Sequence, residues 1–431
     1  MIRHSLISTA ALGTALSVFK FNGVNIDSDE NSSIKRRKRA VELVERFMQR
    51  NGVPGLSVGV SVNGETVWHT GFGYSDVEQL VKCTENTVMR IASISKSITA
   101  TVVARLVESG KLDLDKPIQK YLSNYPVKRY KGIPVDITSR QLLCHTAGIR
   151  HYKEEQKPHE GHLCDKQPNE VTKKNGEFYS NKHYESVEAA LQTFINDELV
   201  AKPGEEFNYT TNGYTLLSAV TESVTGQSFR TQLQSLLLEL GMNHTRLDSN
   251  DDIIPNRTRY YFRDEHGVLK NSSEVDNSNK WAGGGIISTV DDLLVFGNVM
   301  LYRLFTASFR PYNACCRSNH QYSKPLIGAE TLRTFWKGEI TAKESKNYMY
   351  ALGWYKKDDS NQIIYGGCDN AHRHFGYWMH TGGAVGASSV LLIKPNDQEH
   401  AGLCVAVLTN LENCKGLTTL ALELGDIFYP H

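Results

Sequence analysis

The chain has 431 residues, and its charges almost cancel, with 48 Lys and Arg against 47 Asp and Glu. This balance excludes a general nucleic-acid-binding protein, which needs a basic face to neutralise phosphates. Apolar residues make up 40% of the chain, enough for a sizeable core, so wholesale disorder is excluded too. At ~100–200 residues per domain, the length allows two or three domains, or one large core with a second built into it.

The first 26 residues contain no Asp or Glu but several Ser, Thr and basic residues, which is typical of a mitochondrial transit peptide. The apolar run 6–19 also fits a secretory signal peptide, so both interpretations stay open at this point. The run is too short for a membrane span of ~20 apolar residues, and no integral span is expected. We expect residues 1–39 to form a targeting leader and linker, with the acidic stretch 27–33 as the linker.

A basic run at 35–39 precedes apolar residues at helical spacing, namely Val41, Val44, Phe47 and Met48. This pattern predicts an amphipathic helix with a solvated basic end.

The residues 56–62 alternate between apolar and small polar side chains, which predicts a half-buried strand. Asn63-Gly64 follows directly and predicts a hairpin with a return strand. A comparable pair of apolar runs lies near the other end of the chain, at 388–393 and 403–408. Helical patterns lie between the two pairs, at 97–106, 187–195 and 214–224.

We therefore predict an α/β fold of the α+β type, with an antiparallel sheet from both termini, flanking helices and an inserted, mostly helical domain. One folded unit is expected over 40–428. Its sheet lobe takes 40–92 and 376–428, and its helical lobe takes 93–375. A charged, polar insertion at 151–182 has the composition of a lid or a disordered loop.

The sharpest chemical motif is the S-x-x-K of Ser93 and Lys96, which follows a strand-like segment and opens a helix. Residues three apart on a helix share a face, so the lysine amine can accept the serine proton where burial or positive charge discourages its ammonium form. About one such match is expected by chance, and a second copy does occur at 32–35, within the polar linker. Only the copy at Ser93 has the strand-to-helix context that the chemistry needs.

Two other segments supply partners for this motif. Tyr209 is a candidate proton shuttle. The alternative is a structural role, because a tyrosine is more often buried with its hydroxyl in a hydrogen bond. The segment 380–383 reads His-Thr-Gly-Gly ahead of a strong strand. Its glycines would let a substrate approach the backbone and expose an N–H group, or they mark a strand entry or bulge.

No metal or cofactor is expected. The eight cysteines form no CxxC pair and are scattered, which favours free structural thiols over a zinc ribbon or a disulfide scaffold. Two histidine pairs lack a helix-spaced third ligand and are expected to be surface loop residues, namely His159 with His162 and His372 with His374.

The order of an S-x-x-K, a tyrosine segment and a His-Thr-Gly before a C-terminal strand resembles the serine β-lactamase and penicillin-binding-protein superfamily. Further segments resemble it in the expected order, at 110–118, 143–149, 240–242 and 282–289. Three others resemble an animal mitochondrial branch of that superfamily, at 90–97, 145–152 and 380–389. This resemblance favours the mitochondrial leader over the secretory one.

The resemblance implies an acyl-enzyme mechanism. Ser93 would be acylated, Lys96 would activate it, and Tyr209 would relay a proton to the leaving group or from water. The N–H groups of Ser93 and Gly383 would form the oxyanion hole. Four residues would line the substrate pocket, namely Thr211, His380, Thr381 and Gly382.

Two positions depart from the usual superfamily pattern. Thr211 stands where Asn is common, and His380 stands where lysine is common. An imidazole with a pKa near ~6.5 is mostly neutral at pH 7, so a fixed cation for a substrate carboxylate is lost or made pH-dependent. Both departures weaken the case for penicillin hydrolysis and suit an esterase or a peptidase.

The sequence therefore predicts a serine hydrolase that acts on a small peptide, amide or ester. The resemblance further implies the mitochondrial intermembrane space, a homo-oligomer or filament, and a role in lipid metabolism. Two alternatives stay open, a filament-forming scaffold with little turnover and a secreted esterase.

Overall fold

The computed structural model describes residues 26–153, 176–308, 326–343, 347–358, 376–395 and 402–429. Most of the predicted leader and of the charged insertion lies outside these residues. The same holds for the four loop histidines, His159, His162, His372 and His374.

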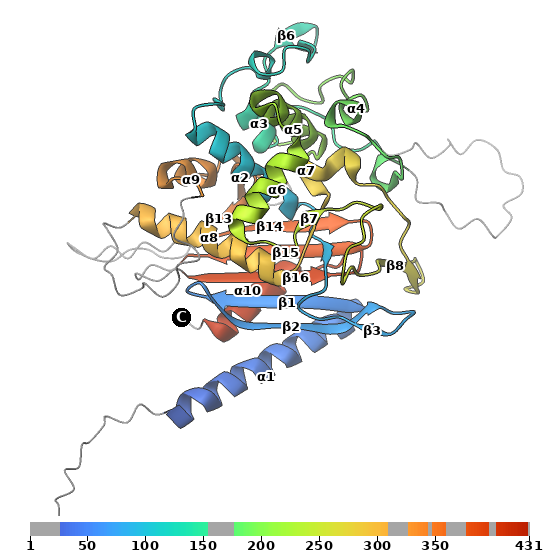
Figure 1. Ribbon diagram of the computed structural model, residues 1–431, viewed down its shortest axis with the longest axis vertical. Helices are drawn as coiled ribbons and strands as arrows, with labels where there is room; N and C mark the ends of the chain where they lie inside the picture. The colour runs from blue at the N-terminus through green and yellow to red at the C-terminus, as the bar shows by residue number, and fades with distance from the viewer. Residues whose placement is uncertain are drawn as a thin grey trace, which may run out of the picture.

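A large antiparallel sheet, nine strands across within the described ranges, forms the centre of the molecule (Figure 1). Its order is β11-β12-β13-β14-β15-β16-β1-β2-β3, so the N-terminal strand β1 pairs directly with the C-terminal strand β16. The six strands from the two chain ends are β1 (Gly55–Val62), β2 (Glu65–Asp76), β3 (Val81–Lys82), β14 (Tyr377–Ala384), β15 (Ala387–Lys394) and β16 (Leu403–Thr409). The prediction of a sheet made from both termini is confirmed.

The predicted hairpin is also confirmed. Asn63 and Gly64 join β1 to β2 with φ of 53° and 84°, as a two-residue hairpin turn requires.

Three further strands extend the sheet beyond β14, namely β11 (Ile340–Thr341), β12 (Met349–Tyr350) and β13 (Tyr355–Lys357). The predicted start of the C-terminal sheet segment at 376 is therefore too late. These strands are two or three residues long, too short to leave a period-two pattern in the sequence.

Helices cover both faces of the sheet. The helices α1 (Ile26–Asn51) and α10 (Leu417–Phe428) lie on one face, where Val58 and Val405 belong to their apolar cluster. The helix α8 (Val290–Ser308) lies on the other face, over residues such as Leu391 and Ala406. Because both faces are buried, β15 and β16 are mostly apolar. The strand β1 is buried on both faces as well, so the prediction that it is half-buried is wrong: its small residues Gly59 and Ser61 face α8.

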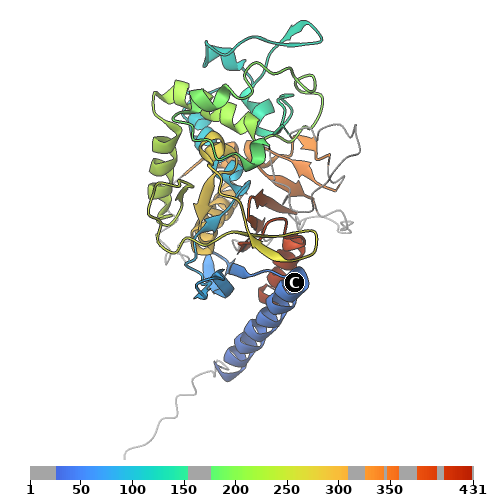
Figure 2. The same ribbon diagram turned by 90° about the vertical axis from the view of Figure 1, so that its right-hand side faces the viewer.

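The helix α1 confirms the predicted amphipathic helix and corrects the predicted linker. Ala40, Val44 and Phe47 pack into the core, whereas the basic end of the helix extends away from the body (Figures 1 and 2). The stretch 27–33 is helical, so its interpretation as a linker is wrong. A helix segment that projects into solvent has no apolar stripe, and its composition is then as polar as that of a loop.

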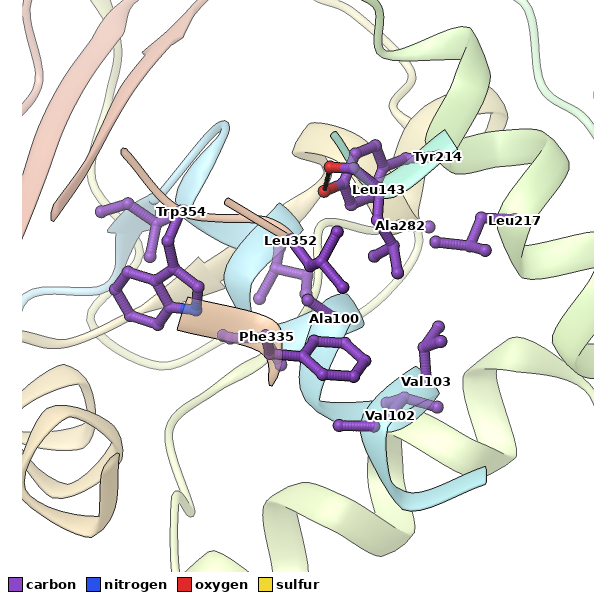
Figure 3. Close-up of a cluster of buried hydrophobic side chains, with 14 of the residues drawn as sticks. Ala100, Val102, Val103, Leu143, Tyr214, Leu217, Ala282, Phe335, Leu352 and Trp354 are labelled. Atoms are coloured by element: carbon purple, nitrogen blue, oxygen red, sulfur yellow. Dashed lines mark hydrogen bonds between the residues drawn. The ribbon is translucent and has the colours of Figure 1, made fainter. Parts of the chain in front are cut away.

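The helical lobe surrounds the buried helix α2 (Ile94–Glu108). Figure 3 shows Ala100, Val102 and Val103 of α2 in one apolar cluster with Phe335 and Leu352. The other helices are α3 (Ser139–Leu143), α4 (Val187–Leu191), α5 (Asn212–Thr225), α6 (Phe229–Leu240), α7 (Trp281–Gly284) and α9 (Ala329–Trp336). Of the helices described, none is both long and apolar enough to cross a bilayer.

Small sheets complete the architecture. One of them, with the order β4-β10-β7, contains β4 (Met89–Arg90), β10 (Ile286–Ser288) and β7 (Arg246–Leu247). It positions the start of α2, because β4 ends just before that helix. Two hairpins are peripheral, β5 (Lys128–Tyr130) with β6 (Ile133–Val135) and β8 (Tyr261–Arg263) with β9 (Leu269–Asn271).

Candidate active site

A tight junction between β4 and α2 holds Ser93. Ala92 has a φ of 49°, in the left-handed region that a non-glycine residue rarely adopts, and Ser93 occupies the N-cap position of α2. Arg90 anchors the junction: its Nε lies 2.7 Å from Oδ2 of the buried Asp248, and its Nη1 donates to the carbonyl oxygen of Val385 at 2.8 Å. A backbone conformation of this kind persists where its surroundings fix it.

Lys96 lies one helical turn after Ser93 and is completely buried. Its Nζ lies within hydrogen-bond distance of Ser93 Oγ at 3.1 Å, Thr211 Oγ1 at 3.3 Å and the carbonyl oxygen of Gly283 at 2.6 Å. Burial, followed by the positive charge of Lys280, holds the pKa of Lys96 well below its ordinary value. The neutral amine, the form that accepts a proton, is therefore favoured.

Tyr209 and Thr211 reach the site from the segment that leads into α5. The Nζ atom of Lys96 lies 4.7 Å from the centroid of the Tyr209 ring, and Thr211 accepts a hydrogen bond from the same amine. The fold thus brings together Ser93, Lys96, Tyr209 and Thr211, which are far apart in the sequence.

The strand β14 lies against the segment that precedes Ser93. A Cβ atom on Gly382 would lie 2.4 Å from the carbonyl oxygen of Ile91 and 2.9 Å from the Cβ of Ala92, so this close approach requires glycine. A Cβ atom on Gly383 would meet nothing within 4 Å. Gly383 is exposed, so its backbone is accessible next to the junction that holds Ser93.

His380 is completely buried, and protein groups occupy both of its ring nitrogens. Its Nδ1 lies 2.7 Å from the carbonyl oxygen of Thr381, and its Nε2 lies 3.0 Å from the hydroxyl of Tyr350. Burial, followed by the charge of Lys96, lowers the pKa of His380 to about 3. In this structure the imidazole offers no free nitrogen and no positive charge to a substrate, in contrast to the expectation that it lines the pocket.

Three residues at the site were not predicted as functional from the sequence. His145 follows α3 with a φ of 61°, and Tyr350 lies on β12, too short a strand to detect. Lys280 is buried, and its Nζ donates to the carbonyl oxygen of Phe178 at 3.2 Å. Burial is the largest cause that lowers the pKa of Lys280, which falls to about 7. The one feature of the sequence that marks Lys280 is its position just ahead of the glycine run at 283–285.

The described part of the chain contains no group of three or more His, Cys, Asp or Glu residues that could hold a metal ion. Its four cysteines, Cys83, Cys144, Cys404 and Cys414, are free thiols.

A fold with a buried lysine behind a serine at the start of a helix, facing a glycine-containing strand, is that of penicillin-binding proteins and β-lactamases. The family model described as Beta-lactamase matches residues 40–420, so the chain belongs to the beta-lactamase family, a family of serine hydrolases. The human mitochondrial serine beta-lactamase-like protein LACTB is 38% identical over an alignment of 445 positions, which spans 90% of this chain and 79% of the human protein.

Solved structures agree on the fold. The octameric penicillin-binding protein homologue from Pyrococcus abyssi has a TM-score of 0.68 at 22% identity, over 91% of this chain and 77% of that one. A D-stereospecific amidohydrolase from Streptomyces sp. has a TM-score of 0.63 at 21% identity, over 93% of this chain and 99% of that one.

Proposed function

We propose that this protein hydrolyses an amide, peptide or ester bond through an acyl-enzyme on Ser93. The observation that carries the proposal is the 3.1 Å hydrogen bond between Ser93 Oγ and the buried amine of Lys96, whose pKa is lowered. A serine hydroxyl is a weak nucleophile until a neighbouring base takes its proton, and a neutral lysine is such a base.

The other contacts of Lys96 suit this role. A neutral amine has two N–H groups and one lone pair. If its N–H groups are directed to Gly283 O and Thr211 Oγ1, at 2.6 Å and 3.3 Å, the lone pair is directed to the Ser93 hydroxyl. The proton of Ser93 then passes to Lys96 while Oγ attacks the carbonyl carbon of the substrate.

The remaining steps use residues on either side of Ser93. The N–H groups of Ser93 and Gly383 hold the oxyanion of the tetrahedral intermediate, where losing one such donor typically costs ~10²–10³ in rate. Tyr209, next to the Lys96 amine, passes its proton to the leaving nitrogen or oxygen, which departs, and takes up in its place the proton that Lys96 received from Ser93. Water then attacks the acyl carbon and gives up a proton to Lys96 by way of Tyr209. The bond between the acyl carbon and Ser93 Oγ breaks, Oγ takes the proton back from Lys96, and the acid is released.

The substrate class follows from the charge of the pocket. His380 stands at the position of the usual lysine but is buried and neutral, so it offers no cation for a substrate carboxylate. Thr381, Gly382 and Thr211 complete the pocket wall in this proposal. We therefore infer a neutral amide, small peptide or ester as substrate rather than a penicillin, in keeping with the amidohydrolase among the fold neighbours.

The location and the assembly state are part of the same proposal. The human relative is named mitochondrial, and the Pyrococcus homologue is octameric. We infer a mitochondrial protein of the intermembrane space that forms homo-oligomers or filaments and acts in lipid metabolism. A fluorescent protein that carries residues 1–39 is expected to enter mitochondria, and its secretion or diffuse distribution would overturn the targeting role.

The decisive experiment replaces the nucleophile. We expect Ser93→Ala to abolish labelling by a fluorophosphonate probe and to lower kcat/KM on an amide and ester library by ~10³-fold or more. The matched control is Ser32→Ala, in the second S-x-x-K, which lies on α1 away from the site and is expected to leave both unchanged. If Ser93→Ala keeps labelling and hydrolysis, the proposal is wrong and a scaffold role is favoured.

A further inference from the structure

Three buried side chains form a link that the proposed mechanism does not use. His145 follows α3, Tyr350 lies on β12 and His380 lies on β14, and none of the three has any exposed surface. The hydroxyl of Tyr350 lies 3.2 Å from His145 Nε2 and 3.0 Å from His380 Nε2. One hydroxyl therefore bridges two imidazoles.

Backbone groups at both ends of this link fix where the protons lie. At one end, the N–H of Thr210 donates to His145 Nδ1 at 3.2 Å, so Nδ1 carries a lone pair and the neutral ring has its proton on Nε2. At the other end, the carbonyl oxygen of Thr381 can only accept, so His380 Nδ1, at 2.7 Å, carries the proton. His380 Nε2 then carries the lone pair.

The Tyr350 hydroxyl completes the link because it both accepts and donates. It accepts the Nε2 proton of His145 and donates its own proton to His380 Nε2. Every donor then has one acceptor, from Thr210 N–H to Thr381 O. A second proton on His145 would point at the Thr210 N–H, so the geometry favours a neutral ring there.

We propose that His145, Tyr350 and His380 form one neutral, directional hydrogen-bonded chain that sets the spacing between two halves of the active site. Thr210 adjoins Tyr209, the proposed proton relay. Thr381 belongs to β14, which carries Gly383 of the proposed oxyanion hole. The inference rests on the proposed function, because the spacing matters for catalysis only if both halves act on one substrate. The three residues are positioning residues, which act through their neighbours.

The surroundings of the two imidazoles oppose a positive charge. The titratable groups that face them are Lys96, His151, Tyr209, Tyr214 and Tyr355. Burial, followed by the charge of Lys96, lowers the pKa of both rings. The hydroxyl of Tyr214 also contacts that of Tyr350, but it donates its own proton to the carbonyl oxygen of Leu143 at 2.9 Å.

The first test reads the protons directly. Imidazole ¹⁵N chemical shifts of histidine-labelled protein are expected to give opposite tautomers, with the proton of His145 on Nε2 and that of His380 on Nδ1, across about pH 5–8. The signals are assigned with His145→Gln and His380→Gln. The same tautomer on both rings, or a protonated ring in this range, would overturn the chain.

The second test separates positioning from stability. Tyr350→Phe removes the bridging hydroxyl and is expected to slow fluorophosphonate labelling of Ser93 by up to about 10²-fold, because small misplacements at a site are costly. The matched control is Tyr261→Phe, which removes the hydroxyl of another buried tyrosine, one that accepts from the backbone N–H of Val77 at 2.8 Å in the cluster under α1 and α10. The control is expected to keep the labelling rate, and unchanged labelling in folded Tyr350→Phe would overturn the positioning role.

Two conservative variants divide the chain at His145. His145→Gln keeps an N–H group that can donate to the Tyr350 hydroxyl. His145→Asn keeps an acceptor for the Thr210 N–H but loses the hydrogen bond to Tyr350. We expect His145→Gln to restore more of the labelling rate than His145→Asn, although Asn suits the left-handed backbone there better. The reverse order would count against the chain. Failure of the proposed function looks different, because Ser93→Ala would then keep its activity while the tautomers stay as assigned.

Discussion

Lys96 is the residue whose surroundings matter most for the proposed chemistry. Its pKa is lowered first by burial and second by Lys280, so the neutral base is present well below the pH at which an exposed lysine loses its proton. Below that pKa the ammonium form accumulates and cannot take the Ser93 proton. The acid limb of kcat/KM is therefore expected to report Lys96.

Removing the second charge gives a prediction with a definite sign. Lys280→Met deletes a positive charge that disfavours the ammonium form of Lys96, so the pKa of Lys96 rises and the acid limb moves to higher pH. The effect is expected to be largest below about pH 7, where Lys280 itself is charged. The measurement is a pH profile of kcat/KM against that of Lys111→Met, an exposed lysine. If the acid limb of Lys280→Met stays in place or moves to lower pH, the electrostatic coupling between Lys280 and Lys96 is contradicted.

Sequence reasoning selected Ser93, Lys96, Tyr209 and Thr211, and the structure brings these four together. Short motifs with a fixed chemical spacing reveal such residues. His145 and Tyr350 could not be found in this way, because their role depends on a contact between segments that are 205 residues apart. The neutral state of His380 likewise follows from its burial, which the His-Thr-Gly triplet does not specify.

At the scale of elements, the contact between β14 and the start of α2 determines the shape of the site. Gly382 and Gly383 are neighbours on β14 with opposite surroundings. An added Cβ on Gly382 would lie 2.2 Å from Ser389 Oγ and 2.4 Å from the carbonyl oxygen of Ile91, whereas on Gly383 it would enter open space.

These two glycines form a matched pair for mutation. Gly382→Ala is expected to push β14 away from α2, lowering the free energy of unfolding by ~1–3 kcal/mol and lowering activity. Gly383→Ala keeps its N–H group and is expected to unfold like the wild type. Chemical denaturation and Ser93 labelling of both variants provide the check. Equal stability of the two would show that the approach at Gly382 is not tight.

The strength of the sequence signal decided which elements were predictable. The strands β1, β15 and β16 and the helix α5 carry long apolar patterns, and the structure contains them close to the predicted bounds. The strands β11–β13 carry too few residues for a period to appear, so the edge of the sheet was missed. The start of α1 was missed because an exposed helix resembles a loop in composition.

At the scale of the whole molecule, α1 is attached to the body by its second half. Val44 is fully buried against the apolar face that α10 also covers, whereas its neighbour Glu45 is exposed. Val44→Asp would place an unpaired carboxylate in that core and is expected to lower the free energy of unfolding by at least ~2 kcal/mol and to speed proteolysis of α1. Glu45→Asp is the matched control and is expected to have little effect. Equal proteolysis rates would mean that α1 is not docked in solution.

The pairing of β1 with β16 has a consequence for biosynthesis. Val58 pairs with Val407, so the centre of the sheet joins the two ends of the chain. Ser93 and Lys96 leave the ribosome long before β14, which faces them, and β16, which pairs with β1. Contacts between such distant segments form slowly and late in folding. A nascent chain therefore carries Ser93, the proposed nucleophile, without the strand opposite it, and the proposed activity can arise only after β14 and β16 have been synthesised.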